Sequence, residues 1–288
     1  MNDKPRRLLT ALVILPPLVL LIGYGSPFSF FILLMGITAG VQYEFYRMHF
    51  TKNLREDRRM IIGIVGGAWI MLGFYIDRPV MMLTGSGIAV LLTALWMCRD
   101  IKAVRSDTAV LALGLLYPVG FLGHLMLIRS DIVGFLADTG AQRVLFLLLV
   151  IWGGDAGAYY IGKIWGRRKI APVVSPNKTI EGAIGGLVCS AVLGGLSSGL
   201  LRKGIETPLG RSPFDPILVD IGLAMVLGLF GQIGDLVESL LKRSADIKDS
   251  GGIIPAHGGL FDKLDSIAFA APVFYYALYC PYLRSMPP

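Results

Sequence analysis

Hydrophobic residues occur in long runs along this sequence, separated by short polar segments. Nine runs of about 17 to 25 residues are long enough to cross a membrane as helices. They lie roughly at 8 to 24, 27 to 46, 60 to 76, 79 to 98, 108 to 128, 144 to 162, 183 to 201, 217 to 241 and 266 to 283. No Lys or Arg falls inside them. The pattern predicts an all-α polytopic membrane protein with about nine transmembrane helices.

The basic residues between the runs predict the topology. With the N-terminus in the cytoplasm, 20 of the 27 Lys and Arg residues fall on the cytoplasmic side, as the positive-inside rule requires. The first run follows a basic start and resembles a signal peptide, but the alternation of charge favours a retained anchor. We therefore expect an integral protein of the inner or plasma membrane, with its N-terminus in the cytoplasm.

The composition supports a membrane protein. Hydrophobic residues make up 54% of the chain and charged residues 16%, below the roughly 25% typical of soluble domains. The mean hydropathy is +0.65. Because the net charge of +7 is explained by the cytoplasmic segments, we expect no nucleic-acid partner.

Polar residues divide the chain into two regions. Residues 1–130 alternate apolar runs with short basic loops, which is typical of a transmembrane scaffold. In residues 131–288, ionisable groups enter the runs or lie at their cytoplasmic ends, where acids are costly and usually functional. This second region is the predicted catalytic region, with a polar site facing the cytoplasm. Its run at 183 to 201 is expected to be an interior helix, packed closely through Gly185, Gly186, Gly194 and Gly195.

The first polar segment of the catalytic region lies within and after the run at 144 to 162. Asp155 lies among small residues, so it either is satisfied by a neighbouring helix or lines a site. Ser175 and Pro176 predict a turn, and Thr179 predicts a helix start. Lys178 would then lie where the N–H groups of a helix N-terminus favour phosphate.

The second polar segment begins in the run at 217 to 241. Four polar residues recur there at i, i+3, i+4 and i+7 and so share one helix face; they are Asp235, Glu238, Ser239 and Lys242. A face with three charges is incompatible with lipid. It is expected to line a polar site or to pack on protein.

The loop that follows this run adds two acids and a glycine pair. Asp262 and Asp265 are three apart at a predicted helix start, and with Asp235 they can hold a hard divalent ion through oxygen ligands. Capping of the helix is the alternative role for such acids. Gly258 and Gly259 can let backbone N–H groups approach a phosphate closely.

Residues 239 to 265 form a motif of fixed spacing. Its members are Ser239, Lys242, Arg243, Lys248, Asp249, Gly251, Ile254, Pro255, His257, Gly258, Gly259, Leu260, Asp262, Leu264 and Asp265. This motif resembles the signature of the phosphatidate cytidylyltransferases, also called CDP-diacylglycerol synthases. An upstream segment is similar to the same family through Asp155, Ala158, Tyr159, Gly162, Ser175, Pro176, Asn177, Lys178, Thr179, Glu181 and Gly182. Lys263 departs from the family pattern, which usually has Arg, so bidentate phosphate geometry is not retained there.

The resemblance implies a reaction, a metal and a set of site residues. The reaction transfers CMP from CTP to phosphatidate, giving CDP-diacylglycerol and pyrophosphate for phospholipid biosynthesis. Mg²⁺ is assigned to Asp235, Asp262 and Asp265, and the family also implies a second cation and a homodimer. The expected catalytic residues are Asp235, Ser239, Lys242, Arg243, Lys248, Asp262 and Asp265. The expected substrate-binding residues are Asp155, Ser175, Asn177, Lys178, Asp249, Gly258 and Gly259.

Two other classes of protein are the alternatives. A CTP-dependent polyprenol or lipid kinase would use similar metal and phosphate groups. A transporter would also place polar residues in its spans, but it predicts paired broken helices near the membrane midplane. Here the acids and cations cluster at one predicted membrane face, which favours an enzyme.

Overall fold

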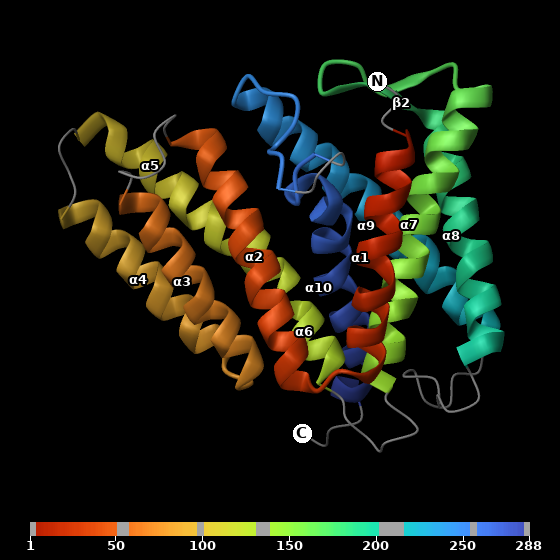
Figure 1. The fold of residues 1–288 in the computed structure, drawn as a ribbon, viewed down its shortest axis with the longest axis horizontal. Helices are drawn as coiled ribbons and strands as arrows, with labels where there is room; N and C mark the ends of the chain where they lie inside the picture. Colours follow the sequence, from red (N-terminus) through yellow and green to blue (C-terminus); the bar gives the residue numbers. More distant parts are fainter. Residues whose placement is uncertain are drawn as a thin grey trace. The chain divides into compact units, whose positions relative to one another are not determined.

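The computed structural model describes residues 4–50, 58–96, 101–130, 139–201, 216–253 and 258–284, and this part of the chain is almost wholly helical (Figure 1). The α-helices are α1 (Lys4–Tyr24), α2 (Pro27–His49), α3 (Arg58–Tyr75), α4 (Pro79–Trp96), α5 (Ile101–Gly114), α6 (His124–Arg129), α7 (Thr139–Trp165), α8 (Ile180–Leu201), α9 (Pro216–Ser244) and α10 (Phe261–Arg284). A π-helical segment, η1 (Leu115–Phe121), joins α5 to α6. The predicted all-α membrane protein is confirmed.

The predicted number of spans is not confirmed. Within the described ranges, seven helical segments are long and apolar enough to cross a membrane, and α5, η1 and α6 together supply one of them, Val104–Arg129. The two predicted spans that are not among these seven are the first and the last, at 8 to 24 and 266 to 283. The described apolar part of α1 is the shorter segment Leu12–Tyr24, and α10 carries three charged residues within its first five.

The chain forms two compact units, which are described separately. The first unit contains Met1–Leu127 and Ser244–Leu264, and the second contains Ile128–Arg243 and Asp265–Pro288. The division after residue 127 lies close to the predicted boundary at 130. The segment Ser244–Leu264, which follows α9, belongs to the first unit.

Polar side chains of α2 join helices within the first unit. The Gln42 amide donates from Nε2 to the carbonyl oxygens of Gly63 and Gly114, at 3.1 Å each. The Tyr46 hydroxyl donates to the carbonyl oxygen of Leu111 at 3.1 Å. These bonds satisfy buried polar atoms that would otherwise be costly in apolar surroundings. They fix α2 against α3 and α5.

In the second unit, α7 and α8 lie side by side and are joined by a small hairpin (Figure 1). Strands β1 (Lys169–Ala171) and β2 (Ser175–Thr179) pair antiparallel. The turn predicted at Ser175 and Pro176 is therefore wrong, because both residues belong to β2 and the chain reverses over residues 172–174. The predicted helix start is confirmed, since α8 begins directly after Thr179 and the Thr179 hydroxyl accepts the Gly182 N–H at 3.2 Å.

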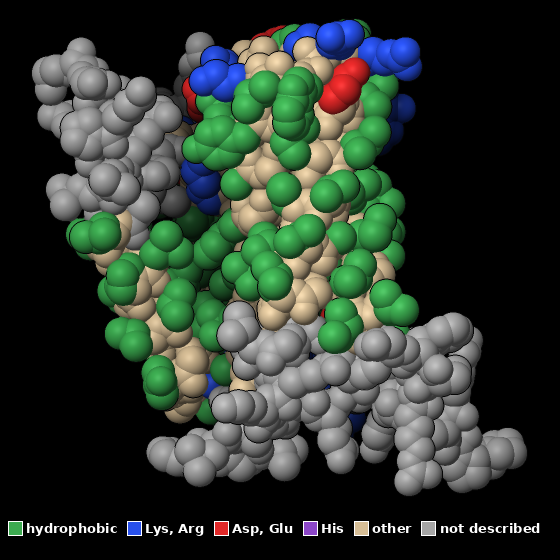
Figure 2. All heavy atoms as spheres, turned by 90° about the vertical axis from the view of Figure 1, so that its right-hand side faces the viewer, with side chains coloured by type: hydrophobic (Ala, Val, Ile, Leu, Met, Phe, Trp, Pro, Cys, Tyr) green, Lys and Arg blue, Asp and Glu red, His purple; other side chains and the backbone are tan. Residues whose placement is uncertain are grey.

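Helix α8 has one face built of small residues and one apolar face. Gly182, Gly185 and Gly186 lie against α7 so closely that a Cβ on each would come within 3.0 Å of α7 atoms. Another stripe of the helix is exposed along Ile184, Val188, Val192 and Leu196. The predicted glycine packing is confirmed, whereas the prediction of an interior helix is wrong. Figure 2 shows hydrophobic side chains over the middle of this face, and Lys and Arg side chains at the end that carries the hairpin.

Replacement of Gly182 by Ala tests the α7–α8 packing. A Cβ there would lie 2.7 Å from the Ala158 carbonyl oxygen and 3.0 Å from the Gly162 Cα, and backbone atoms cannot move aside cheaply. We expect Gly182→Ala to lower the unfolding free energy in detergent by about 1–3 kcal/mol. The control is Gly222→Ala on α9, where a Cβ meets nothing within 4 Å; equal destabilisation of the two variants would contradict the packing.

Candidate functional site

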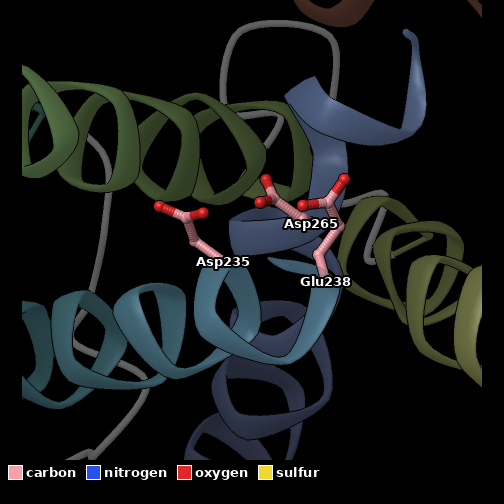
Figure 3. A group of neighbouring side chains, drawn as sticks. All are labelled: Asp235, Glu238 and Asp265. Atoms are coloured by element: carbon pink, nitrogen blue, oxygen red, sulfur yellow. The ribbon is translucent and has the colours of Figure 1, made fainter. Parts of the chain in front are cut away.

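Three carboxylates gather in the second unit, where α9 meets the start of α10 (Figure 3). Asp235 and Glu238 extend from one face of α9, as the sequence predicts, and Asp265 extends from α10. Each offers an oxygen atom, and these oxygens all lie within 4.8 Å of one another. Glu238 is 1% exposed and Asp265 is 6% exposed. Such an arrangement of buried negative charge requires cations nearby.

Two lysines supply positive charge to this cluster. Lys178 Nζ lies 2.5 Å from Oδ2 of Asp235, and Lys242 Nζ lies 2.7 Å from Oε2 of Glu238, one helical turn away on α9. Lys178 also interacts electrostatically with Asp265, as does the carboxylate of Asp155 on α7. Lys178 and Asp155, from the first polar segment of the sequence, thus lie near the carboxylates of the second segment.

The hairpin places Lys178 directly before α8. The Glu181 carboxylate, in the first turn of α8, binds the chain just before β1. It accepts hydrogen bonds from the backbone N–H groups of Arg167 at 2.9 Å and Arg168 at 3.1 Å. The Arg243 guanidinium, at the end of α9, donates to the carbonyl oxygen of Val174 in the hairpin at 3.5 Å. Basic residues from both motif segments therefore lie on the same side of the second unit.

Other predicted residues of these two segments differ in their exposure. Ser239 is half-buried on α9, Ser175 is half-buried in β2, and Asn177 is exposed in the same strand. Lys248 and Asp249 are exposed in the first unit. His257 lies outside the described residues.

Asp262 binds backbone groups within the first unit. Its Oδ2 accepts the Ser250 N–H at 3.3 Å and the Gly259 N–H at 3.1 Å. Both donors precede α10, which begins at Phe261, so these bonds attach Asp262 to the loop before the helix. A metal-ligand role for Asp262 stays a prediction. Gly258 has φ of +89°, a backbone conformation that suits glycine. The Gly259 N–H, predicted to approach a phosphate, here serves the Asp262 carboxylate.

Two acids have contacts that the sequence interpretation did not assign. Glu238 lies on the predicted polar face, and its spacing of four residues from Lys242 is the signal for their ion pair. Glu44 lies in the region interpreted as scaffold and is 1% exposed. Its signal is an acid within an apolar run, since such acids are usually functional.

These features define an integral membrane protein with a carboxylate and lysine cluster at the ends of its helices. The chain belongs to the cytidylyltransferase family, whose profile matches residues 5–281. It is 42% identical over 139 residues to a phosphatidate cytidylyltransferase of Bacillus subtilis (strain 168), with 48% of each chain covered. It is 43% identical over 138 residues to a phosphatidate cytidylyltransferase of Staphylococcus aureus (strain COL), covering 46% of this chain and 48% of that protein. The chain spans about half the length of the curated relatives it matches.

Removal of Lys242 tests whether the lysines compensate buried charge. Lys242→Met removes the ion pair between Lys242 and the buried Glu238 carboxylate and is expected to lower the unfolding free energy in detergent by about 3 kcal/mol. Adding Glu238→Gln to the same protein should restore most of this stability, because the buried charge is then gone. The exposed Lys263 provides the control, Lys263→Met, with little expected change. A double variant no more stable than Lys242→Met would contradict the pairing.

Proposed function

We propose that this protein transfers CMP from CTP to phosphatidate, forming CDP-diacylglycerol and pyrophosphate for phospholipid biosynthesis. The observation that carries the proposal is the cluster of Asp235, Glu238 and Asp265 with its two lysines, in a chain of the cytidylyltransferase family. Acids that bind a cation, and lysines that bind phosphate, are the groups that a transfer between two phosphate compounds needs.

The carboxylate cluster fits Mg²⁺. Magnesium prefers oxygen ligands and is commonly held by one or two carboxylates together with substrate phosphates. Asp235 and Asp265 offer such oxygens, and Glu238 lies within the same 4.8 Å. When bound, Mg²⁺ would neutralise charge on the CTP phosphates. A second cation, which the family resemblance implies, remains part of the proposal.

The lysines would exchange carboxylate for phosphate when CTP binds. Lys178 is 29% exposed in its side chain and Lys242 is 13% exposed, so each can turn from its carboxylate towards an anionic ligand. Arg243 and Lys248 are exposed basic groups for the triphosphate or the phosphatidate headgroup. Ser239 would donate a hydrogen bond, and Ser175, Asn177, Asp155 and Asp249 complete the proposed substrate contacts, together with the backbone at Gly258 and Gly259.

The reaction needs little proton transfer. A phosphatidate phosphate oxygen, ionised at neutral pH, forms a bond to the α-phosphorus of CTP, and the bond from that phosphorus to the bridging oxygen breaks. The electron pair leaves with pyrophosphate. The protein therefore contributes positioning and charge neutralisation. The diacyl chains stay in the bilayer while CTP arrives from the cytoplasm, and a homodimer is the proposed assembly.

Product analysis tests the proposed function. Purified protein in detergent is incubated with CTP labelled at the α-phosphorus, phosphatidate and Mg²⁺, and the lipids are separated. We expect labelled CDP-diacylglycerol and an equal amount of pyrophosphate, with CTP preferred over ATP. With a polyprenol or diacylglycerol and CTP labelled at the γ-phosphorus, a labelled phosphorylated lipid would instead favour the lipid kinase.

Charge removal without a change of shape tests the acids. Asp235→Asn and Asp265→Asn should each reduce CDP-diacylglycerol turnover about a hundredfold or more, because loss of a metal ligand commonly costs several kcal/mol of transition-state stabilisation. Lys263→Arg is the control and should stay close to the wild type. Normal turnover of both Asn variants at limiting Mg²⁺ would refute the carboxylate metal site.

Asp262→Asn distinguishes the two roles of Asp262. Asparagine keeps an oxygen acceptor for the Gly259 N–H but removes the charge that a hard cation requires. From the bonds in the structure, we expect turnover to fall by less than about tenfold, because the hydrogen-bond acceptor is retained and only its charge is lost. A loss as large as that of Asp265→Asn would instead make Asp262 a metal ligand, as predicted from the sequence.

Cysteine labelling tests the proposed cytoplasmic orientation. In a cysteine-free background, single cysteines at Val173, in the hairpin turn, and at Gly252 are at exposed positions. Both should react with a membrane-impermeant maleimide in inverted vesicles and stay unlabelled in intact cells. Reaction of either one in intact cells would place its segment outside and contradict the orientation.

A further inference from the structure

Glu44 is a buried carboxylate outside the cluster described above. It lies near the end of α2 and is 1% exposed. Its Oε2 accepts the backbone N–H of Phe261 at 2.9 Å and the hydroxyl of Ser250 at 3.3 Å. Within the described part of the chain, its Oε1 has no hydrogen-bond partner. A buried acid at such a cost in solvation is expected to have a function.

The Phe261 N–H is one of the unsatisfied donors of a helix N-terminus. Phe261 is the first residue of α10, and the first four N–H groups of a helix have no partner within it. A carboxylate satisfies such a donor and also complements the positive end of the helix dipole. Glu44 thus supplies from α2, 217 residues away in the sequence, a cap that most helices obtain from their own sequence.

The ring of Phe261 is held from the same side. It packs edge-on against Phe45, with ring centroids 6.0 Å apart, and against Tyr117, with centroids 5.4 Å apart. One turn earlier on α2, a Cβ on Gly40 would lie 2.9 Å from Cδ2 of Leu260. Both the backbone and the side chains at the start of α10 are therefore fixed by the first unit.

Two glycines of the signature motif make room for the Glu44 carboxylate. A Cβ on Gly251 would overlap Oε1 of Glu44 and lie 2.7 Å from its Cδ. A Cβ on Gly259 would lie 2.8 Å from Oε2 of Glu44. The neighbouring Gly252 differs, because a Cβ there meets nothing within 4 Å. The motif thus carries glycine where the carboxylate comes close.

We propose that Glu44 is a positioning residue of the transferase, which holds Ser250 and the first turn of α10 in the conformation needed for turnover. The inference rests on the proposed function. It gives part of the predicted scaffold region a direct role in shaping the signature motif. The carboxylate acts through backbone and hydroxyl donors, and no contact with substrate is required of it.

The glycine pair provides a matched test. Gly251→Ala pushes the Glu44 carboxylate from its place and should reduce turnover at saturating CTP and phosphatidate about tenfold or more, as expected when a hydrogen bond to a charged group is lost. Gly252→Ala, one residue further, should stay within about twofold of wild type. Equal losses in the two variants would overturn the proposal.

Substitution of Glu44 itself adds a test of mechanism. Glu44→Ala should reduce turnover about ten- to hundredfold, whereas Glu44→Gln, which keeps an acceptor for the Phe261 N–H, should recover a large part of it. In the Glu44→Ala protein, the further change Gly251→Ala should cost little, because the space is already vacated. Additive losses, or no rescue by Gln, would contradict the positioning role.

Amide hydrogen exchange separates positioning from general destabilisation, and it requires no substrate. Compared with the wild type, the Glu44→Ala variant should show faster exchange in the peptide around residues 250–264, with the rest of the chain unchanged. Gln42→Leu is the control, since Gln42 lies on the same helix but bonds Gly63 and Gly114; it should leave that peptide protected. Unchanged exchange at 250–264 in Glu44→Ala would refute the inference, while absence of CDP-diacylglycerol formation by the wild type would refute the proposed function instead.

Discussion

A carboxylate surrounded by apolar side chains must be paired, and this requirement determines much of the structure. The desolvation of an isolated buried charge costs far more than a protein can spare, so each buried acid needs a cation or several hydrogen-bond donors. In the second unit, Lys178 pairs with Asp235 and Lys242 pairs with Glu238. In the first unit, the Ser250 hydroxyl and the Phe261 N–H donate hydrogen bonds to Glu44.

The same pairing explains how the helices of the second unit are arranged. Lys178 lies in β2, just before α8, and the hairpin positions it beside Asp235. The Glu181 carboxylate binds the backbone just before β1 and so stabilises the hairpin. Helix α8 in turn lies close to α7 because glycines replace larger residues on the facing side. Small residues, a capped helix and an ion pair thus act together to bring one lysine to one carboxylate.

The helices could be predicted from the sequence because hydrophobic periodicity and basic loops are local signals. The polar face of α9, the start of α8 after Thr179 and the start of α10 before Asp262 follow from spacing alone. The sequence does not predict the hairpin, because Ser175 and Pro176 are typical of a turn. Whether such a short segment forms a strand depends on its tertiary context. The role of Glu44, and the close approach of Gly251 and Gly259 to its carboxylate, depend on contacts between residues about two hundred positions apart. Spacing within a motif does not reveal such contacts.

Metal binding at the three carboxylates is the central claim, and electron paramagnetic resonance of Mn²⁺ tests it most directly without any assumption about substrates. Mn²⁺, an oxygen-binding substitute for Mg²⁺, is titrated into the purified protein in detergent, and the free ion is measured. The wild type should retain Mn²⁺, Mg²⁺ should displace it, and Asp265→Asn should bind it at least about tenfold more weakly, as for a lost carboxylate ligand. Equal Mn²⁺ affinity of the wild type and Asp265→Asn would contradict the account.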